Sequence, residues 1–309
     1  MDCSGFRTKL LGEALGTEFE SFKSTLANDK ALTFNLPNNG VIQPYTGVTT
    51  MNNGWCWNIP MRKEDHYGYV FSSQFCDEET AAAEARARFG HFENYKIVNF
   101  RSGRHKKAWN KNVFAIGNAY AFIEPLESTA IQTAVHSIMS LCKLMPHSHA
   151  DSSSIAGLNQ EVAATWDTFR WFLGIHYKFN KQLDTPYWKY VRENTNIGDA
   201  KYVVDLFNVR PPLSASSFGS NSAFTALEAL VFNSYSYDTL LFGQKEVPQP
   251  LKKPLMSKAE YLSKLESYKA LTDRALTLQE LFESEALFEE GILEDLFAEQ
   301  DTWIVETEA

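Results

Sequence analysis

The stretch NVFAIGNAYAFIEPLESTAIQTAVHSIM (residues 112–139) gives the clearest indication of the fold. Its first half predicts a buried strand that ends at Gly117, and its second half predicts a helix that begins near Ser128. The first turn of a helix carries unpaired backbone N–H groups and a partial positive charge, which favour an anion. A glycine at position 117 lets the backbone approach a phosphate or a ring closely. The pattern therefore predicts either an anion or cofactor site or ordinary packing.

The chain before this stretch is predicted to contain mainly strands, with turns marked by Pro, Asn and Gly. The predicted strands are residues 31–37, 41–45, 55–60, 67–73, 96–100 and 112–117. A helix is predicted over residues 77–89, because acidic residues occupy its first turn and arginines lie near its end. The opening residues 1–6 are typical of a strand end and a glycine turn, and a helical segment follows them.

The chain after this stretch is predicted to be nearly all helix. Apolar residues recur there at helical spacing, namely Ile155, Leu158, Val162, Trp166, Phe169, Leu173 and Tyr177. A further helix is predicted to start with Thr185 as its cap and Pro186 at its first position. Another is predicted over residues 223–241, and the apolar residues of the acidic tail favour amphipathic helices. The sequence thus predicts a mixed region over residues 1–149 and a helical region over residues 150–309.

Composition excludes several functional classes. The net charge is −9, yet residues 275–309 carry 11 acidic residues and no Lys or Arg, which leaves 27 acidic against 29 basic residues elsewhere. This balance is unlike that of a nucleic-acid-binding protein. We expect no membrane-spanning helix and no export signal. The four cysteines lack CxxC spacing, which predicts reduced thiols, a cytoplasmic location and no metal site.

Two longer motifs carry a resemblance to a known family. GNAYAFIEPLESTAI (residues 117–131) is close to the pattern GxAxxFxEPLESTGI of flavin-dependent tryptophan halogenases, and WCWNIP (residues 55–60) matches their WxWxIP signature. The segments DCSGF, HYGYVFSS, SGRHKKAW and DTPYW are also similar to segments of that family. The matches run from residue 2 to about residue 190 in the family's order. The chain is therefore identified as a member of this family.

The resemblance implies a fold and an activity. The implied fold is α/β (α+β), the later part of a flavin monooxygenase-like FAD-binding domain with an antiparallel substrate-side sheet and a helical C-terminal region. In the implied reaction, reduced FAD supplied by a flavin reductase reacts with O2 and a halide to give hypohalous acid. The hypohalous acid then passes through a tunnel and halogenates an electron-rich aromatic substrate such as tryptophan or another indole. The protein contributes positioning and water exclusion.

The EPLEST segment supplies the catalytic residues that the resemblance implies. Glu127 is the expected catalytic glutamate, which either orients the hypohalous species or accepts the proton that the ring loses. The alternative is that a glutamate before a helix only complements the helix dipole. Ser128 is expected to cap the helix and touch substrate, while backbone N–H groups of Thr129 and Ala130 are expected to hold halide. The family usually has Gly where Ala130 stands, which puts the closest approach there in doubt.

Other site residues follow from the same resemblance. The expected flavin contacts are Ser4, Gly5, Gly117, Asn118, Ala119 and Ile131. The residues expected to separate flavin from substrate are Trp55, Trp57, Ile59 and Pro60, for which an ordinary cross-strand aromatic cluster is the alternative. Tyr235 and Tyr237 are expected to bind substrate. A basic group either meets FAD phosphate or is plain surface, and its members are Arg101, Arg104, Lys106 and Lys107.

Two features of the family have no counterpart in the sequence. It contains no GxGxxG motif, and the family's catalytic lysine falls upstream of DCSGF. We therefore expect that an N-terminal segment is missing, that the chain binds FAD poorly and that it does not halogenate by itself. Two alternatives stay open, an aromatic hydroxylase or epoxidase, and a non-catalytic remnant or subunit. WCWNIP argues against the first.

Overall fold

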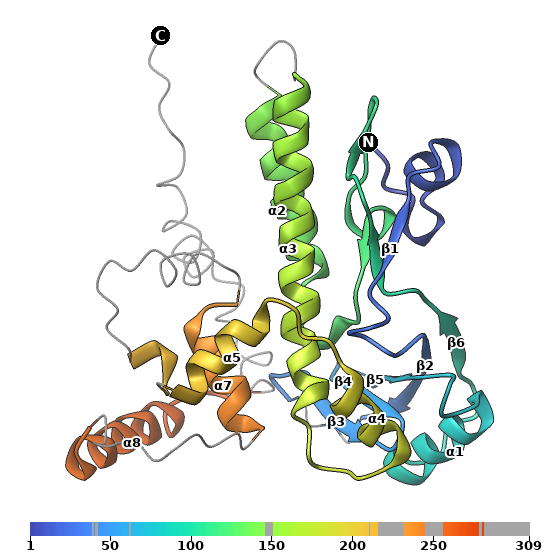
Figure 1. The fold of residues 1–309 in the computed structure, drawn as a ribbon. Coiled ribbons are helices and arrows are strands. Elements are labelled where there is room, and N and C mark those ends of the chain that lie inside the picture. The colour runs from blue at the N-terminus through green and yellow to red at the C-terminus, as the bar shows by residue number, and fades with distance from the viewer. Residues whose placement is uncertain are drawn as a thin grey trace.

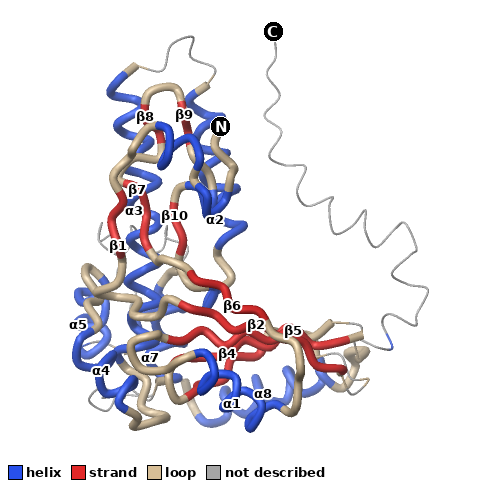
Figure 2. Tube along the Cα trace, turned by 90° about the vertical axis from the view of Figure 1, so that its right-hand side faces the viewer, coloured by secondary structure: helices blue, strands red, loops and turns tan. Residues whose placement is uncertain are grey.

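The computed structural model describes residues 1–38, 40, 43–61, 63–145, 151–209, 211–215, 232–244, 256–277 and 280. An antiparallel sheet occupies one end of the molecule, and a long pair of helices, α2 (Ala130–Leu144) and α3 (Ser152–Lys178), rises from it (Figure 1). Figure 2 shows the smaller strands stacked along this pair, above the main sheet. This mixture of antiparallel sheet and helix confirms the predicted α/β (α+β) class.

The main sheet has five strands in the order β3-β4-β5-β2-β6. Their bounds are Lys30–Pro37 (β2), Gly47–Met51 (β3), Gly54–Ile59 (β4), Glu64–Phe71 (β5) and Lys96–Asn99 (β6). Helix α1 (Glu78–Phe89) covers one face, where its alanines pack on Leu32, Phe34 and Tyr69. Asp77 caps this helix, because its side chain accepts a hydrogen bond from the N–H of Thr80.

A second group of short elements lies beside α2 and α3. Strands β1 (Phe19–Ser21), β7 (Gly103–His105) and β10 (Ala121–Phe122) form a sheet in the order β1-β7-β10. Strands β8 (Trp109–Asn110) and β9 (Val113–Phe114) form a hairpin. The short helices here are η1 (Gly5–Arg7), η2 (Lys9–Ala14), η3 (Gly117–Ala119) and η4 (Pro125–Glu127).

The remaining elements are helical. They are α4 (Pro186–Asn194), α5 (Ala200–Val209), η5 (Leu213–Ala215), α7 (Ser234–Gly243) and α8 (Lys258–Thr272). Helix α4 begins as predicted, because Pro186 is its first residue and the Thr185 hydroxyl accepts from the N–H of Trp188. No helix in the described ranges is long and apolar enough to span a membrane.

Helix α3 forms the centre of the larger hydrophobic cluster. Its predicted apolar stripe is confirmed, since Leu158, Val162, Trp166, Phe169, Leu173 and Tyr177 are all buried. Each large apolar side chain that becomes fully buried stabilises the fold by roughly 1.5–3 kcal/mol. The cluster also contains side chains from before residue 149. The division of the chain at that residue stays a prediction.

An ion-pair network joins α3 to the three-stranded sheet. The guanidinium of Arg104 contacts Asp167 at 3.0 Å and Glu20 at 3.1 Å. Arg170 also contacts Glu20, at 3.2 Å. Each of these acids is shared by two arginines, so the network links β1, β7 and α3 at once.

Helix α2 presents its apolar stripe outward. Ile131 is 80% exposed and Met139 54% exposed, whereas the buried residues of the helix include Thr133, Ser137 and Ser140. Small hydroxyl residues let α2 lie against α3, and the Ser140 hydroxyl donates to Glu161 at 2.6 Å. Helical periodicity alone does not tell which side of such a helix faces α3.

Several predicted boundaries differ from the structure. Residues 43–45 form a loop, and residues 41–42 lie outside the described residues. The predicted strand over residues 112–117 is wrong in length, because only Val113–Phe114 pair as a strand and η3 begins at Gly117. The segment after Thr8 is a π-helix. The predicted helix over residues 223–241 is observed only from Ser234, and residues 223–231 lie outside the described residues. Of the acidic tail, only residues 275–277 and 280 are described.

We predict that Gly68→Ala destabilises the protein. Gly68 faces Trp57 across the β4–β5 pair, and a Cβ at position 68 would overlap the Trp57 indole ring. Overpacking of this kind raises the free energy of the folded state by about 1–3 kcal/mol. Urea unfolding would measure the loss. Gly157→Ala is the matched control, because a Cβ there meets nothing within 4 Å and lies in a helix, so its effect should be neutral or stabilising. Equal stability of both variants and the parent would contradict the prediction.

Candidate active site

A cavity of about 630 Å³ lies between the edge of the main sheet and helices α3 and α7. Its volume suits a small organic ligand. Aromatic, aliphatic and neutral polar side chains make up most of the lining. The lining residues are Val48, Thr50, Trp55, Leu126, Glu127, Phe172, His176, Tyr177, Asn180, Gln182, Trp188, Phe232, Tyr235, Ser236, Thr239, Leu240, Gly243 and Gln244.

Glu127 and His176 lie in direct contact at this cavity. The Nε2 atom of His176 lies 2.7 Å from Oε1 of Glu127, and both side chains are largely shielded from solvent, with exposures of 20% and 31%. Glu127 ends η4, which precedes α2, while His176 lies in the last turn of α3. The end of α3 therefore faces the segment that the sequence predicted to be catalytic.

Aromatic side chains form two parts of the cavity wall. Phe172 stacks on Phe232 with ring centroids 3.9 Å apart. Tyr177 stacks on Trp188 at 6.0 Å, and the Trp188 indole N–H donates to the carbonyl of Met51 at 2.7 Å. Trp55 lines the cavity from β4. Flat rings at several angles are suited to enclosing another flat ring.

A second carboxyl group lies behind this wall. Glu124 is only 1% exposed and accepts a hydrogen bond from the indole N–H of Trp55 at 2.9 Å. Burial raises the pKa of Glu124, and the hydrogen bonds from Trp55, Tyr177 and Asn28 oppose that rise. The two glutamates of EPLES therefore occupy different environments, one inside the protein and one at the cavity.

The structure corrects one detail at the start of α2. Thr129, and not Ser128, is the residue that precedes the helix, and it makes no side-chain capping hydrogen bond. Ser128 has a left-handed backbone with φ of 53° and ends η4, so the prediction that it caps α2 is wrong. Ser128 is exposed and does not line the cavity, Thr129 is buried, and Ala130 is the first helical residue. The first N–H groups of α2 have no partner within the helix.

The predicted flavin contacts come together from distant parts of the sequence. The residues around η1, which include Ser4 and Gly5, lie against η3, which consists of Gly117, Asn118 and Ala119. Helix α2, which carries Ile131, also contacts η3. Gly5 and Gly117 both have positive φ, and the space where each Cβ would lie is open. This arrangement fits close approach by a ligand.

Asn118 lines a second cavity of about 280 Å³, together with Phe6, Arg101 and His105. His105 is almost fully buried. Its Nδ1 lies 2.8 Å from the carbonyl oxygen of Thr17 and its Nε2 lies 3.2 Å from the hydroxyl of Thr8. Burial lowers the pKa of His105, against the hydrogen bond to Thr17. These partners satisfy the neutral imidazole, which donates at Nδ1 and accepts at Nε2.

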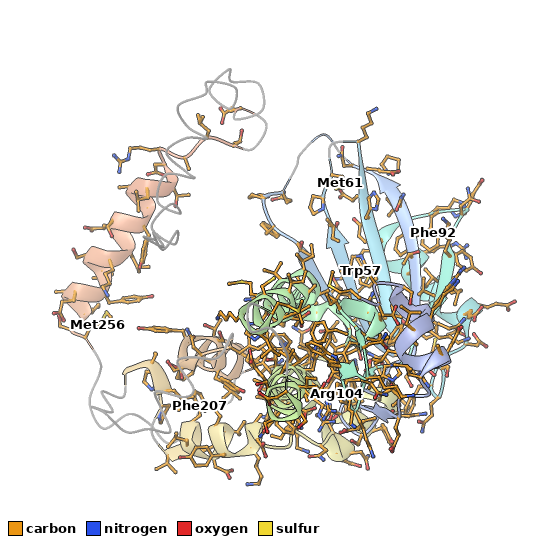
Figure 3. The ribbon with its side chains drawn as sticks, turned by 90° about the horizontal axis from the view of Figure 1, so that it is seen from above. Trp57, Met61, Phe92, Arg104, Phe207 and Met256 are labelled. Atoms are coloured by element: carbon orange, nitrogen blue, oxygen red, sulfur yellow. The ribbon has the colours of Figure 1, made fainter. Side chains whose placement is uncertain are left out.

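The four residues expected to separate flavin from substrate do not act as one surface. Trp55 lines the 630 Å³ cavity, whereas Trp57 and Ile59 line a third cavity at the far end of the sheet. The Trp55 and Trp57 rings are 5.8 Å apart, and Figure 3 shows Trp57 on the sheet. Pro60 follows β4 directly. The separating role of these residues stays a prediction.

The remaining predicted residues divide between the cavity and the interior. Tyr235 lines the cavity, but Tyr237 is buried behind it with its ring edge on Phe172 at 5.0 Å. The predicted basic group also divides. Arg104 is buried in the ion-pair network (Figure 3), Lys106 pairs with Glu18, Arg101 lies over the Phe19 ring, and Lys107 is exposed.

Sequence reasoning missed the contribution of α3 to the site. Tyr177 was recognised only as a member of an apolar stripe, and His176 was not singled out. One signal was available, since His176 is a polar residue one position from that stripe near the end of the helix. Its partner, Glu127, lies 49 positions away, and no periodicity relates the two.

Comparison with known proteins gives a family match over most of the chain. A family model for tryptophan halogenases matches residues 1–260. The tryptophan 7-halogenase RebH of Lentzea aerocolonigenes is 32% identical over 70% of this chain and 42% of its own length. The tryptophan 6-halogenase SttH of Streptomyces toxytricini is 32% identical over 92% of this chain and 54% of its own length. The chain thus spans about half the length of the curated relatives it matches.

Solved structures agree with this match. The crystal structure of MibH, a lanthipeptide tryptophan 5-halogenase, superposes with a TM-score of 0.84 and 42% sequence identity. The superposition covers 93% of this chain and 55% of MibH. The similarity therefore includes the described cavity and the sheets around it.

We predict that His105 makes folding sensitive to acid. Because its pKa in the folded protein is lowered, the neutral form stabilises the fold above the unfolded pKa of about 6.5. That stability is lost as pH falls below this value towards the lowered pKa. Urea unfolding at about pH 7.5 and about pH 5.5 should show a larger loss for the parent than for His105→Gln, which has no imidazole to protonate. Identical losses in the two proteins would contradict the prediction.

Proposed function

Because the chain belongs to the tryptophan halogenase family, we propose that it serves the flavin-dependent halogenation of an electron-rich aromatic ring held in the 630 Å³ cavity. The observation that carries this proposal is the Glu127 carboxylate at the wall of an aromatic cavity, paired with His176 at 2.7 Å. A flat ring in this cavity would have aromatic neighbours on several sides and one carboxylate beside it. That is the arrangement that electrophilic substitution on a ring requires.

Glu127 has a defined task in this proposal. When an electrophilic halogen from hypohalous acid bonds to a ring carbon, that carbon must lose its proton. Glu127 accepts this proton as a general base and then passes it to the hydroxide that the hypohalous acid releases, so that the products are the halogenated ring and water and the carboxylate is regenerated. His176 lies against this carboxylate, with Nε2 2.7 Å from Oε1, and so limits the space in which the carboxylate can turn.

Halide and flavin would be held by the elements around the start of α2. Backbone N–H groups of Thr129 and Ala130 lie at the N-terminus of α2, where partial positive charge favours an anion. Gly5, Gly117 and Asn118 have open space in front of them that fits a ring or a ribityl chain. Bound reduced FAD would supply the reducing equivalents with which O2 oxidises the halide. We propose that a flavin reductase provides it.

The substrate class is an indole. RebH and SttH are named for tryptophan, while MibH is named for a tryptophan within a lanthipeptide. Both kinds of substrate present the same indole ring to the aromatic wall. A free amino acid and a peptide differ in the charges next to that ring. Comparing their affinities for the chain therefore distinguishes the two kinds of substrate.

The first test of the function is binding to the cavity, which needs no flavin. Saturation-transfer NMR would measure contact of indole, free tryptophan and a Gly-Trp-Gly tripeptide with the chain. We expect an indole-containing ligand to bind, and Tyr235→Ala to weaken that binding, because Tyr235 lines the cavity and is also accessible. An absence of binding by all three ligands would remove the proposed role of the cavity.

The second test is chemical. The chain receives reduced FAD from a flavin reductase, with O2, chloride or bromide, and the ligand that binds best. It is assayed alone and with a separately produced polypeptide that carries a GxGxxG nucleotide-binding segment. We expect no product from the chain alone and a halogenated indole from the mixture, identified by its isotope pattern in mass spectrometry.

Variants then test the role of Glu127. We expect Glu127→Gln to lower the rate by about 100-fold or more, because the amide cannot accept the ring proton. Glu161→Gln is the control, since Glu161 contacts His136 at 3.2 Å in a second His–Glu pair that does not line the cavity. An oxygenated product formed without halide would favour the hydroxylase alternative. Equal rates for the two variants would exclude Glu127 as the base.

A further inference from the structure

A buried polar network lies directly behind the wall of the cavity. It consists of Asn28, Trp55, Glu124, Tyr177 and Tyr187. The Oε2 atom of Glu124 accepts from the Trp55 indole N–H at 2.9 Å, from the Asn28 amide at 3.0 Å and from the Tyr177 hydroxyl. The Tyr187 hydroxyl donates to Oδ1 of Asn28 at 2.9 Å. We call these five residues the Glu124 network.

The members of the Glu124 network come from five separate parts of the fold. Asn28 precedes β2, Trp55 lies in β4, Glu124 lies between β10 and η4, and the two tyrosines lie in α3 and α4. One carboxylate oxygen thus connects the main sheet to the helices that close the cavity. Only Trp55 and Tyr177 of this network line the cavity, and Glu124 itself does not. Glu124 therefore reaches a ligand only through other side chains.

Packing alone does not explain a carboxyl group at this position. Transfer of a carboxylate into the interior carries a large desolvation penalty, so an apolar residue of similar volume would fill the space at lower free energy. Oε1 of Glu124 is also buried and has no hydrogen-bond partner among the described residues. The carboxylate fixes the orientation of its neighbours, because three hydrogen-bond donors must point at one oxygen atom.

The direction matters for the two side chains that face the ligand. The indole of Trp55 could rotate about its χ angles within an apolar wall, but its N–H is held by Glu124. Tyr177 is held in the same way through its hydroxyl, which also accepts from Asn28 at 3.0 Å. Glu124 is joined to Glu127 by Pro125 and Leu126 within the short turn η4. The same residue therefore anchors the segment that carries the carboxylate at the cavity.

We propose that Glu124 is a positioning residue that holds Trp55 and Tyr177 as one rigid wall of the aromatic-ligand cavity and anchors Glu127 at its edge. The proposal rests on the proposed function only in the identity of the ligand. It predicts that loss of the carboxylate changes the wall and the affinity for an aromatic ring, beyond any change in stability.

The direct readout is the Trp55 indole N–H signal in a ¹⁵N–¹H correlation spectrum of the ¹⁵N-labelled chain. The signal is assigned by its disappearance in Trp55→Phe. In Glu124→Gln, we expect this signal to move upfield, because a neutral amide oxygen is a weaker acceptor than a carboxylate. We also expect indole to bind about tenfold more weakly, because a weaker acceptor holds the Trp55 and Tyr177 side chains less firmly.

Glu84→Gln is the matched control. Glu84 is a half-buried carboxylate on α1 that accepts from the Tyr69 hydroxyl at 2.8 Å and from the N–H of Asn52 at 2.7 Å, and it does not line the cavity. We expect this variant to leave both the Trp55 signal and the indole affinity unchanged, even if its free energy of unfolding falls. An effect of Glu84→Gln equal to that of Glu124→Gln would reduce Glu124 to a structural role.

A second variant keeps the test decisive if Glu124→Gln does not fold. Tyr177→Phe removes one donor and leaves the carboxylate in place, so the Trp55 signal should still move, because both groups share Oε2 of Glu124. An unmoved Trp55 signal in either folded variant would overturn the proposal. If the parent chain binds no indole, the proposed function fails, while the Trp55 signal still decides the positioning role.

Discussion

Burial of one face of α3 is the constraint on which the other parts of the structure depend. The helix runs for 27 residues, and its buried stripe contacts side chains from both the short elements beside it and the main sheet. Because apolar burial is the largest favourable term in folding, burial of this stripe favours the assembly of these elements around α3. The same helix carries Asp167 and Arg170 into the ion-pair network and places Phe172, His176 and Tyr177 at the cavity.

The environments of the Glu124 and Glu127 carboxylates depend on where each lies relative to α3. Glu124 lies against the stripe and is buried there, so three hydrogen-bond donors replace the water that would otherwise solvate its carboxyl group. Glu127 is three residues further on, past the turn that Pro125 begins, and it reaches the cavity, where His176 pairs with it. One short turn thus separates a carboxylate that organises the wall from one that faces a ligand. Side-chain identity alone does not distinguish them, because both are glutamates in the same five-residue motif.

Much of the fold could be predicted from periodicity and capping. The apolar stripe of α3, the Thr185–Pro186 start of α4 and the acid-led helix α1 are confirmed, because each depends on contacts within a few residues. The strand predicted over residues 112–117 was too long, since only Val113–Phe114 form a strand and Ala115 makes a single isolated bridge to Asp2. The sequence also did not predict that Ile131 on α2 faces outward, because periodicity identifies an apolar stripe but not the element that the stripe faces.

By itself, the sequence determined the family, the α/β class and the segment that carries Glu127, because motifs and local propensities are written along the chain. Only the tertiary structure decided that His176 pairs with Glu127, that Trp55 and Trp57 line different cavities, and that Glu124 connects a strand to two helices. Most of these are contacts between residues that lie far apart in sequence, and Trp55 and Trp57 share one strand face but have different neighbours in space. Their geometry depends on how the sheet and α3 pack, and that packing is a property of the whole chain.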